Sequence, residues 1–541
     1  MSRTPASVIR WLFSSEAGVS DRLLPRWIFL RCLGLIYFSA FYALLFQICG
    51  LIGPDGILPA REYLEAVARQ FGGSRFWFAP TLLWLSSGGH MLTGLCWAGM
   101  IASLLVVLNV WPRATLLVCL VCFLSFVAAA QDFSGYQSDG MLLEAGFISL
   151  FFAPAGLWPG LGRASPPSHA SLFLLLWEWF RIYFGSGVVK LASGDPEWRN
   201  FTAMDEYYQN GPLPTWIGWY VQHLPHWFHA VTTGATLVLE LSLVFMMFLP
   251  RRWRIACFFI ATLWQIPVIL TANYTFLNYL VLVLGFLLLD DAFLARVVPG
   301  GWRHVLREPA APAEKPGSEP QSPADEGATP APPPHPVAAF RLALTSVVLL
   351  WIFYATTAQL IWMLVPGFPL PRSPVAALEP FRIANRYGLF AVMTRGRYEV
   401  EFQGSEDGEN WVAYPFRYKP QDLRQRPRIY APYQPRFDWN LWFASLGSWR
   451  ENLLVPSTEE RLLAGAPDVL ALFAGNPFPH APPKQVRAVL WQYWFTSRPE
   501  KRATGMWWRR ELIGLYAPVL EREPDGRMIV VQWPESLPRR E

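Results

Sequence analysis

Charged side chains inside long apolar stretches are the residues of this sequence best suited to chemistry. A charge at the centre of a membrane helix costs roughly 3 kcal/mol on insertion scales, so such residues usually face a bundle interior or a cavity. One interpretation is that these charges neutralise one another between helices and fix the packing. The other is that they line a cavity in which a lysine acts as a base or binds an anionic group. The set is Asp139, Glu144, Glu178, Arg181, Lys190 and Glu240.

The stretch Trp177–Pro225 holds three of these charges and is the first candidate for a site. It begins as a hydrophobic helix that narrows at Gly185-Ser186-Gly187 and ends near Lys190, before an aromatic and polar loop. Glu178 and Arg181 are three positions apart and share a helix face, which predicts an ion pair between them. Lys190 is the candidate base, with Glu144 or Glu240 tuning it.

Composition indicates the scaffold that must position these residues. Of the 541 residues, 53% are hydrophobic and 16% are charged, whereas soluble domains carry about 25% charged residues. Apolar runs near the ~20 residues needed to cross a bilayer predict a polytopic α-helical membrane domain. The net charge of +5 gives no reason to expect nucleic acid as a partner.

About nine membrane spans are predicted, with the N-terminus in the cytoplasm. Arginines such as Arg113, Arg163 and the cluster Arg251–Arg254 all fall on the side of the N-terminus, as the positive-inside rule requires. With nine spans, the C-terminal domain lies on the lumenal or periplasmic side. The predicted spans are 27–49, 82–110, 114–131, 141–158, 170–190, 230–249, 254–272, 274–294 and 340–366.

Four regions follow from these patterns. They are a multi-span membrane domain (1–307), a disordered cytoplasmic linker rich in proline and alanine (308–337), a last span (338–370) and a soluble β-rich α+β domain (371–541).

In the soluble domain, alternation over 397–403 and 411–416 around the turn residues SEDGENW predicts a β-hairpin. Further strands are expected at 385–393 and 528–533, and helices at 441–449, 458–473 and 483–493. The run 418–438 mixes arginine, tyrosine and proline, which fits either a partner-binding surface or an irregular segment packed over the hairpin.

The remaining motifs favour structural roles. All six cysteines lie in or beside hydrophobic segments, and Cys119-x-x-Cys122 reads as buried packing within an apolar helix. No spacing predicts a metal site or a bound cofactor. Asn200 stands in a sequon that a eukaryotic host could glycosylate.

Several separate blocks make the chain similar to the lipase maturation factor family of endoplasmic reticulum membrane proteins. The blocks are QSDGMLLEAGF (137–147), FGSGVVKLASGDPEWRNFTAMDEYYQNGPLP from 184, YGLF with YEVEFQGSEDGENW, RFDWNLWFA and LFAGNPFP. One position departs from the pattern: animal members have a cysteine just before the tryptophan of GDxxW, and here it is Glu197. This argues against disulfide or redox roles and fits a bacterial origin.

The resemblance implies a helical membrane domain with a lumenal domain that engages clients, and it marks a set of motif positions. A weaker resemblance covers GVVKL, which is similar to the GVKKLDxxW segment of vitamin K-dependent gamma-glutamyl carboxylases, where the matching lysine is a base. Most of the carboxylase's soluble portion has no counterpart here. The motif positions of the first family are Asp139, Glu144, Lys190, Asp195, Trp198, Arg199, Asp438, Trp439, Asn476 and Pro477.

Two functional hypotheses follow. In the first, the chain is a non-catalytic, membrane-anchored maturation factor that helps secreted proteins such as lipases to fold, in the endoplasmic reticulum membrane or a bacterial inner membrane. In the alternative, it is a membrane enzyme that uses Lys190 as a base on a quinone or lipid.

Overall fold

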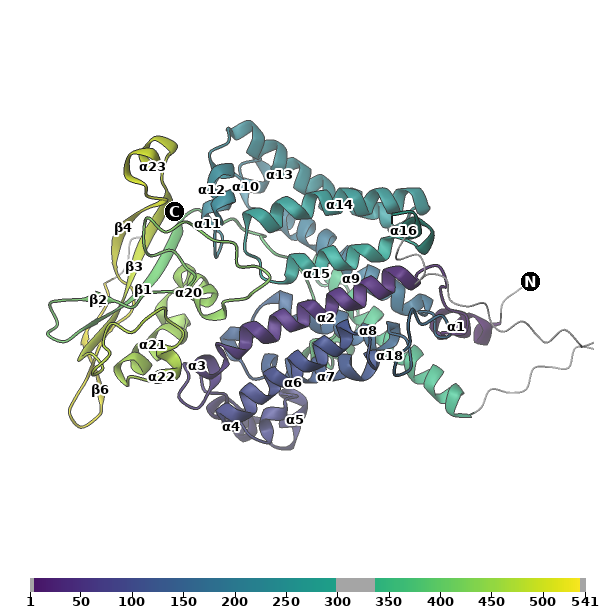
Figure 1. The fold of residues 1–541 in the computed structure, drawn as a ribbon, viewed down its shortest axis with the longest axis horizontal. Helices are drawn as coiled ribbons and strands as arrows, with labels where there is room; N and C mark the ends of the chain where they lie inside the picture. Colours follow the sequence, from purple (N-terminus) through teal and green to yellow (C-terminus); the bar gives the residue numbers. More distant parts are fainter. Residues whose placement is uncertain (1–3, 298–335, 536–541) are drawn as a thin grey trace, which may run out of the picture.

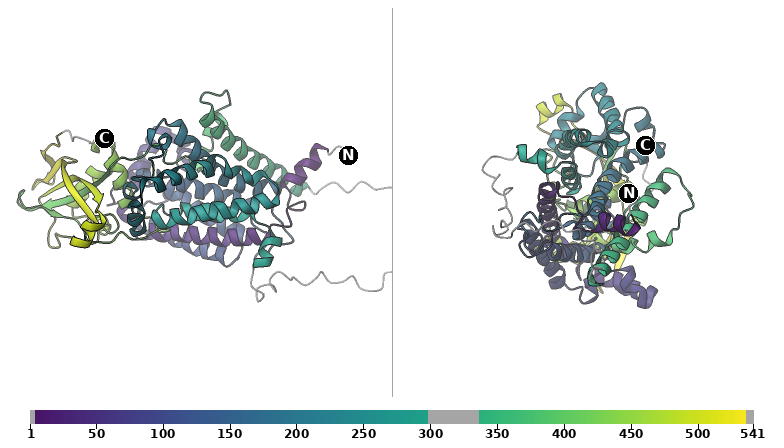
Figure 2. Two further views of the ribbon diagram at one scale, coloured as in Figure 1. Left: turned by 90° about the horizontal axis from the view of Figure 1, so that it is seen from above. Right: turned by 90° about the vertical axis from the view of Figure 1, so that its right-hand side faces the viewer.

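The computed structural model describes residues 4–297 and 336–535, which form a helical bundle with a sheet domain at one end (Figure 1). The N-terminus lies at the opposite end of the bundle from the sheet (Figure 2). The predicted linker 308–337 falls outside the described residues except for its last two, which begin a helix.

Nine helices of the described residues correspond to the nine predicted spans. They are α2 (Leu23–Leu45), α6 (Gly89–Val107), α7 (Pro112–Val127), α8 (Gln137–Phe152), α9 (His169–Ala192), α13 (His226–Leu241), α14 (Arg251–Thr271), α15 (Leu277–Gly285) and α18 (Pro336–Leu364). Shorter helices join them or lie at the ends of the bundle: α1 (Pro5–Phe13), α3 (Ile48–Ile52), α4 (Ala60–Phe71), α5 (Arg75–Phe78), α10 (Pro196–Arg199), α11 (Tyr207–Asn210), α12 (Trp216–Gln222), α16 (Asp291–Val297) and α19 (Ser373–Ala376).

The structure supports six to eight apolar helices, which lowers the predicted number of spans. Within the described residues, six helices are long and apolar enough to cross a membrane, and Pro112–Val127 and Leu277–Leu288 are shorter apolar helices. The remaining helix, α8, has 16 residues and is therefore about 24 Å long, less than the roughly 30 Å of a hydrocarbon core. Among the six, α9 is the most buried and α18 the least, so α9 forms the centre of the bundle.

The C-terminal domain is built on a six-stranded antiparallel sheet. Its strand order is β2-β1-β3-β5-β6, and β4 also pairs with β3. The strands are β1 (Arg397–Ser405), β2 (Val412–Ala413), β3 (Gln485–Phe495), β4 (Trp508–Leu515), β5 (Val519–Arg522) and β6 (Met528–Gln532). Helices α20 (Arg436–Leu446), α21 (Leu454–Leu463) and α22 (Pro467–Leu470) lie between this sheet and the bundle, and α23 (Arg498–Thr504) lies at its edge (Figure 1).

The predicted hairpin is confirmed, since Gln403 pairs with Ala413 in the register of β1 and β2. The strand predicted at 528–533 is confirmed as β6. The helix predicted at 458–473 is divided into α21 and α22, because Gly465 adopts a φ of +67° that ends the first helix.

Two predictions for this domain are wrong. The helix expected at 483–493 is the central strand β3, because a strand covered on both faces reads as a continuous apolar run that resembles a buried helix. The strand expected at 385–393 is an irregular segment. Its backbone groups bind side chains of the membrane bundle and are not paired in a sheet.

Candidate functional site

A bidentate ion pair joins the bundle to the sheet domain. Asp139 lies in the first turn of α8, and Arg436 is the first residue of α20. The two Arg436 guanidinium nitrogens donate to the two Asp139 carboxylate oxygens at 2.7 and 2.8 Å. Both residues are almost fully buried, at 1% and 0% exposure. A paired geometry of this kind gives strong charge-assisted hydrogen bonds and fixes orientation.

A second buried cluster lies between α8, α9 and the segment after α19. Arg181 forms an ion pair with Glu144 and donates to the backbone oxygen of Asn385 at 2.7 Å. The backbone N–H of Asn385 donates to the other Glu144 oxygen at 2.8 Å. We call Asp139, Arg436, Glu144, Arg181 and Asn385 together the polar junction.

The predicted pairing of Glu178 with Arg181 is therefore corrected. Arg181 is directed at Glu144 on the neighbouring helix, where the Asn385 backbone completes the set of donors and acceptors. The carboxylate oxygens of Glu178 have no hydrogen-bond partner among residues 4–297 and 336–535, although the side chain is fully buried. Two residues on one helix face can pair. Here Glu144 on the neighbouring helix, which also accepts hydrogen bonds from Asn385, binds Arg181 in place of Glu178.

Lys190 pairs with Glu240 on α13 and not with Glu144. Its ammonium lies 2.8 Å from both Glu240 oxygens and 5.0 Å from the centre of the Trp198 ring. Gly187 permits this approach, because a Cβ there would meet Leu241 and Glu240 side-chain atoms at 2.8–3.0 Å. Both charged groups line a cavity of about 300 Å³. The sequence left Glu144 and Glu240 as alternative partners of Lys190, and the structure brings Glu240 there.

The motif residues after Lys190 hold the irregular segment 385–393 against the bundle. One Asp195 oxygen accepts from the Glu197 backbone at 3.1 Å and begins α10, and the other accepts from the Met393 backbone at 2.6 Å. The Trp198 indole donates to the Phe390 backbone oxygen at 2.9 Å. These contacts attach the segment that leads into the sheet to the loop after α9.

Two further predicted positions lie on the surface of this loop. Arg199 is exposed and donates to the backbone oxygen of Leu191 at 3.4 Å, and Asn200 is exposed at the end of α10. Within the described residues, neither side chain makes a hydrogen bond or an ion pair with Lys190 or Glu240.

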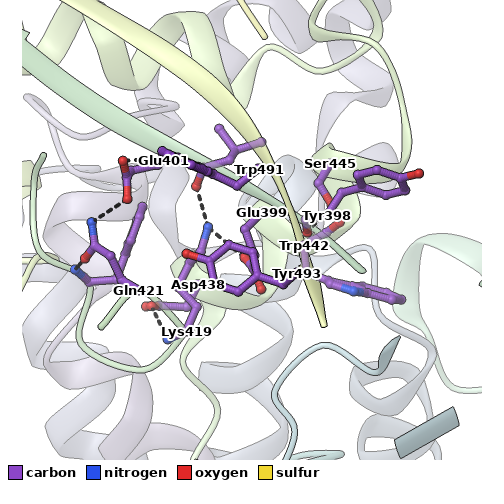
Figure 3. Close-up of polar contacts among 12 residues, drawn as sticks. Tyr398, Glu399, Glu401, Lys419, Gln421, Asp438, Trp442, Ser445, Trp491 and Tyr493 are labelled. Carbon is purple, nitrogen blue, oxygen red and sulfur yellow. Dashed lines mark hydrogen bonds and ion pairs between the residues drawn. The ribbon is translucent and has the colours of Figure 1, made fainter. Parts of the chain in front are cut away.

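The C-terminal domain contains its own buried charge network on one face of β1 (Figure 3). Glu399 lies 2.9 Å from the Lys419 ammonium. Glu401 accepts from the Gln421 amide at 3.1 Å and from the Trp491 indole at 3.2 Å. Strand β1 therefore has both faces covered, because the start of the 418–438 run packs over the charged face.

The rest of that run also contacts the bundle, which favours the packed interpretation over a free partner-binding surface. The Asn273 amide donates to the Arg428 backbone oxygen at 2.9 Å, and its oxygen accepts from the Tyr430 N–H at 2.6 Å. Asn273 is consequently buried.

Two domain models of one family match the chain. The model of the lipase maturation factor transmembrane domain matches residues 24–296, and that of the lipase maturation factor C-terminal domain matches residues 383–518. Lipase maturation factor 1 of Bos taurus is 33% identical over 534 residues, which cover 95% of this chain and 92% of that protein. The chain belongs to the lipase maturation factor family. Lipase maturation factor 2 of Gallus gallus is 32% identical, covering 92% of this chain and 81% of that protein. No solved structure matches the chain.

In this lipase maturation factor, the C-terminal family match begins at residue 383 and so includes the segment that binds the bundle.

The remaining motif residues of that domain have structural contacts. Trp439 packs edge-on against Tyr136, with ring centres 5.3 Å apart. Asn476 and Pro477 form an exposed turn in which the Asn476 oxygen accepts from the Phe478 N–H at 2.9 Å.

Sequence reasoning missed Arg436, Asn385 and Lys419 as partners of the predicted charges. Arg436 stands in RFDWNLWFA, two residues before the predicted motif position Asp438. The available signal for this pair was Asp139, a carboxylate near a helix start for which the sequence offers no nearby cation. Asn385 and Lys419 act partly through backbone groups, and backbone contacts leave no pattern in side-chain types.

Asp438 gives a prediction for the pH dependence of stability. Burial raises the pKa of this carboxyl to about 6, opposed by hydrogen bonds from the Lys419 and Tyr418 backbone and by the Lys419 charge. The usual pKa of this group is 3.8. Between pH 3.8 and about pH 6, the folded state therefore holds a proton that the unfolded chain has released. The contribution of Asp438 to the free energy of unfolding therefore falls as pH rises through this window, by about 3 kcal/mol.

The change Asp438→Asn keeps an acceptor for both backbone N–H groups and removes the titration. We expect the variant to unfold at a higher temperature than the wild type at pH 7, with the difference shrinking toward zero at pH 4. Thermal unfolding of the purified protein across this range measures it. A difference that stays constant with pH would contradict the assignment.

Proposed function

We propose that the C-terminal sheet domain of this chain engages partly folded lipases on the side of the membrane opposite the N-terminus. The chain is a membrane factor that assists lipase folding and maturation, as its family membership shows. That domain would lie in the lumen of the endoplasmic reticulum in a eukaryotic host, or in the periplasm in a bacterial one. The separation of N-terminus and sheet at opposite ends of the bundle supports this placement (Figure 2).

The exposed apolar edge strand β6 is the observation that supports client binding most directly. All five of its residues are exposed, and among the described strands it pairs only with β5, at the end of the sheet path. Val531 is 49% exposed, and Trp533 just beyond the strand is 60% exposed. Stable proteins usually protect such edges with charges, prolines or bulges because they pair with other chains. β6 has one register shift against β5, beside Val531, and its apolar side chains remain exposed there. An extended segment of an unfinished lipase could add to this edge by main-chain hydrogen bonds, with specificity from alternate side chains.

A factor of this kind acts by binding and needs no reaction chemistry. It would hold an aggregation-prone segment until the client's own strands or partner subunit replace it. The buried charges then serve as scaffold, because the polar junction fixes the sheet domain to the bundle and presents β6 away from the membrane. Removing residues 371–541 would leave Asp139 buried without Arg436 and Glu144 without its hydrogen bonds from Asn385, so a surface change tests client binding more cleanly.

The substitution Val531→Lys is expected to lower client maturation several-fold while leaving thermal stability unchanged. A charge on an edge strand blocks strand addition but costs little at an exposed position. The assay is the activity per unit mass of a secreted lipase co-expressed with the chain in cells lacking their own maturation factor.

Val412→Lys is the matched control, since Val412 is also 49% exposed and lies on β2 at the opposite edge of the sheet. Equal lipase activity with the two variants would show that β6 has no special part in client binding.

The alternative of a membrane enzyme rests on the position of Lys190 beside a cavity. The close approach of both Glu240 oxygens to its ammonium argues against a free base there. Lys190, Glu144 and Glu240 are accordingly proposed as structural groups.

A further inference from the structure

Two cavities meet where the bundle joins the sheet domain. The first, of about 300 Å³, lies among α9, α13, α14 and α15 and includes the Lys190–Glu240 pair; we call it the membrane cavity. The second, of about 570 Å³, lies between the start of α8, the loop before α12 and α20. Five residues line both and form a mostly aromatic wall between them: Tyr207, Tyr274, Leu277, Leu389 and Phe390.

The membrane cavity has no net charge to offer a ligand. Lys190 and Glu240 are its charged lining residues, and they neutralise each other at 2.8 Å. A phosphate or carboxylate entering here would have to displace Glu240 from Lys190. Charge therefore selects against anionic ligands and favours neutral ones.

Several buried polar side chains in the cavity have no hydrogen-bond partner among the described residues, including the Tyr274 hydroxyl and two further groups of the lining. Asn278 on α15 is 7% exposed and Tyr387 is 6% exposed, and both line the cavity. Within the described residues, neither the Asn278 amide nor the Tyr387 hydroxyl makes a hydrogen bond. Buried polar groups are nearly always hydrogen-bonded, and an amide supplies both a donor and an acceptor. These groups are suited to a ligand head that both donates and accepts, such as a hydroxyl next to an ester carbonyl that accepts.

The rest of the lining is apolar and aromatic, including Ile182, Trp264, Val268 and Val281. This combination of an apolar wall with a few polar groups is typical of small-molecule sites, and the volume falls at the lower end of their range. The helices around the cavity are apolar enough to stand in a bilayer, which makes membrane lipids the ligands at hand.

We propose that the membrane cavity binds the chain of one uncharged glycerolipid, of the diacylglycerol class, with its hydroxyl or ester head hydrogen-bonded to Asn278 and Tyr387. The site is independent of the β6 edge. Loss of lipid binding and loss of client binding can therefore be measured separately.

The test uses the full chain in lipid nanodiscs that contain a trace of diacylglycerol carrying a photoreactive diazirine on its acyl chain. After irradiation, peptide mass spectrometry locates the cross-links. We expect them on α13, α14 and α15 at cavity positions. Diazirine-bearing phosphatidate and an isoprenoid quinone with the same reactive group serve as the anionic and quinone arms, and each should label the cavity at least several-fold less.

Two variants report on the site. Asn278→Leu keeps the side-chain volume but removes the polar head contact, and Thr236→Phe fills the space between α13 and the cavity. Both should reduce cavity labelling by diacylglycerol at least several-fold, whereas Thr236→Val, which keeps the shape of the native side chain, should leave it unchanged. Melting temperatures identify a variant that fails to fold, in which case the other variant decides.

Labelling that is unchanged in a folded variant, absent from the cavity in the wild type, or equal or greater with the phosphatidate or quinone probe would overturn the proposal.

Discussion

Arg436→Met is expected to destabilise the protein by about 3–5 kcal/mol and to abolish lipase maturation. The change removes one partner of a buried ion pair and leaves the Asp139 carboxylate without compensation at 0% exposure. Because the pair joins α8 to α20, the loss also weakens the attachment of the sheet domain to the bundle. Thermal unfolding of the purified protein and the secreted lipase assay measure the two effects.

The double variant Asp139→Leu with Arg436→Met separates pairing from packing. Replacing a buried ion pair by apolar residues of similar volume is often neutral, so we expect most of the stability and maturation to return. Arg424→Met, at an exposed arginine of the same domain, should change neither. If the single variant were as stable as the wild type, the polar junction would not hold the two parts together.

Lys190→Met is expected to lose maturation through stability, by about 3–5 kcal/mol, because Glu240 would remain buried at 9% exposure without its cation. Adding Glu240→Gln removes the stranded charge and should restore most of the melting temperature and most of the lipase activity.

This pair of variants distinguishes a scaffold from an enzyme. A base cannot be replaced by methionine, so a catalytic Lys190 would leave the double variant folded but without activity. Recovery of stability without recovery of maturation would therefore reject the structural assignment and support the enzyme hypothesis.

The sequence predicted the elements that depend on local pattern and not those that depend on distant partners. Apolar runs identified the bundle helices, and alternation with turn residues identified the hairpin of β1 and β2. The segment 385–393 contains residues compatible with a strand. Its structure, however, is decided by acceptors on Glu144 and Asp195, about 200 positions or more away.

The candidate site shows the same division. The types of the charged residues placed them inside the bundle, because an unpaired charge in lipid is costly. Their pairing was not accessible, since Arg436 and Asp139 are 297 positions apart and Arg181 prefers Glu144, 37 positions away, to its neighbour on the helix. Spacing on one helix shows which charged side chains are able to pair. The packing of the neighbouring elements determines which ion pairs form.

Site-specific photo-crosslinking from β6 tests directly whether this edge binds immature lipase. A photoreactive amino acid at position 531, and in a separate variant at position 412, would be activated in cells that co-express a secreted lipase. Client binding at β6 predicts a covalent adduct between the chain and immature lipase from position 531 and little or none from position 412. Maturation that proceeds normally with no adduct at 531, or with equal adducts at both positions, would contradict client binding at this edge.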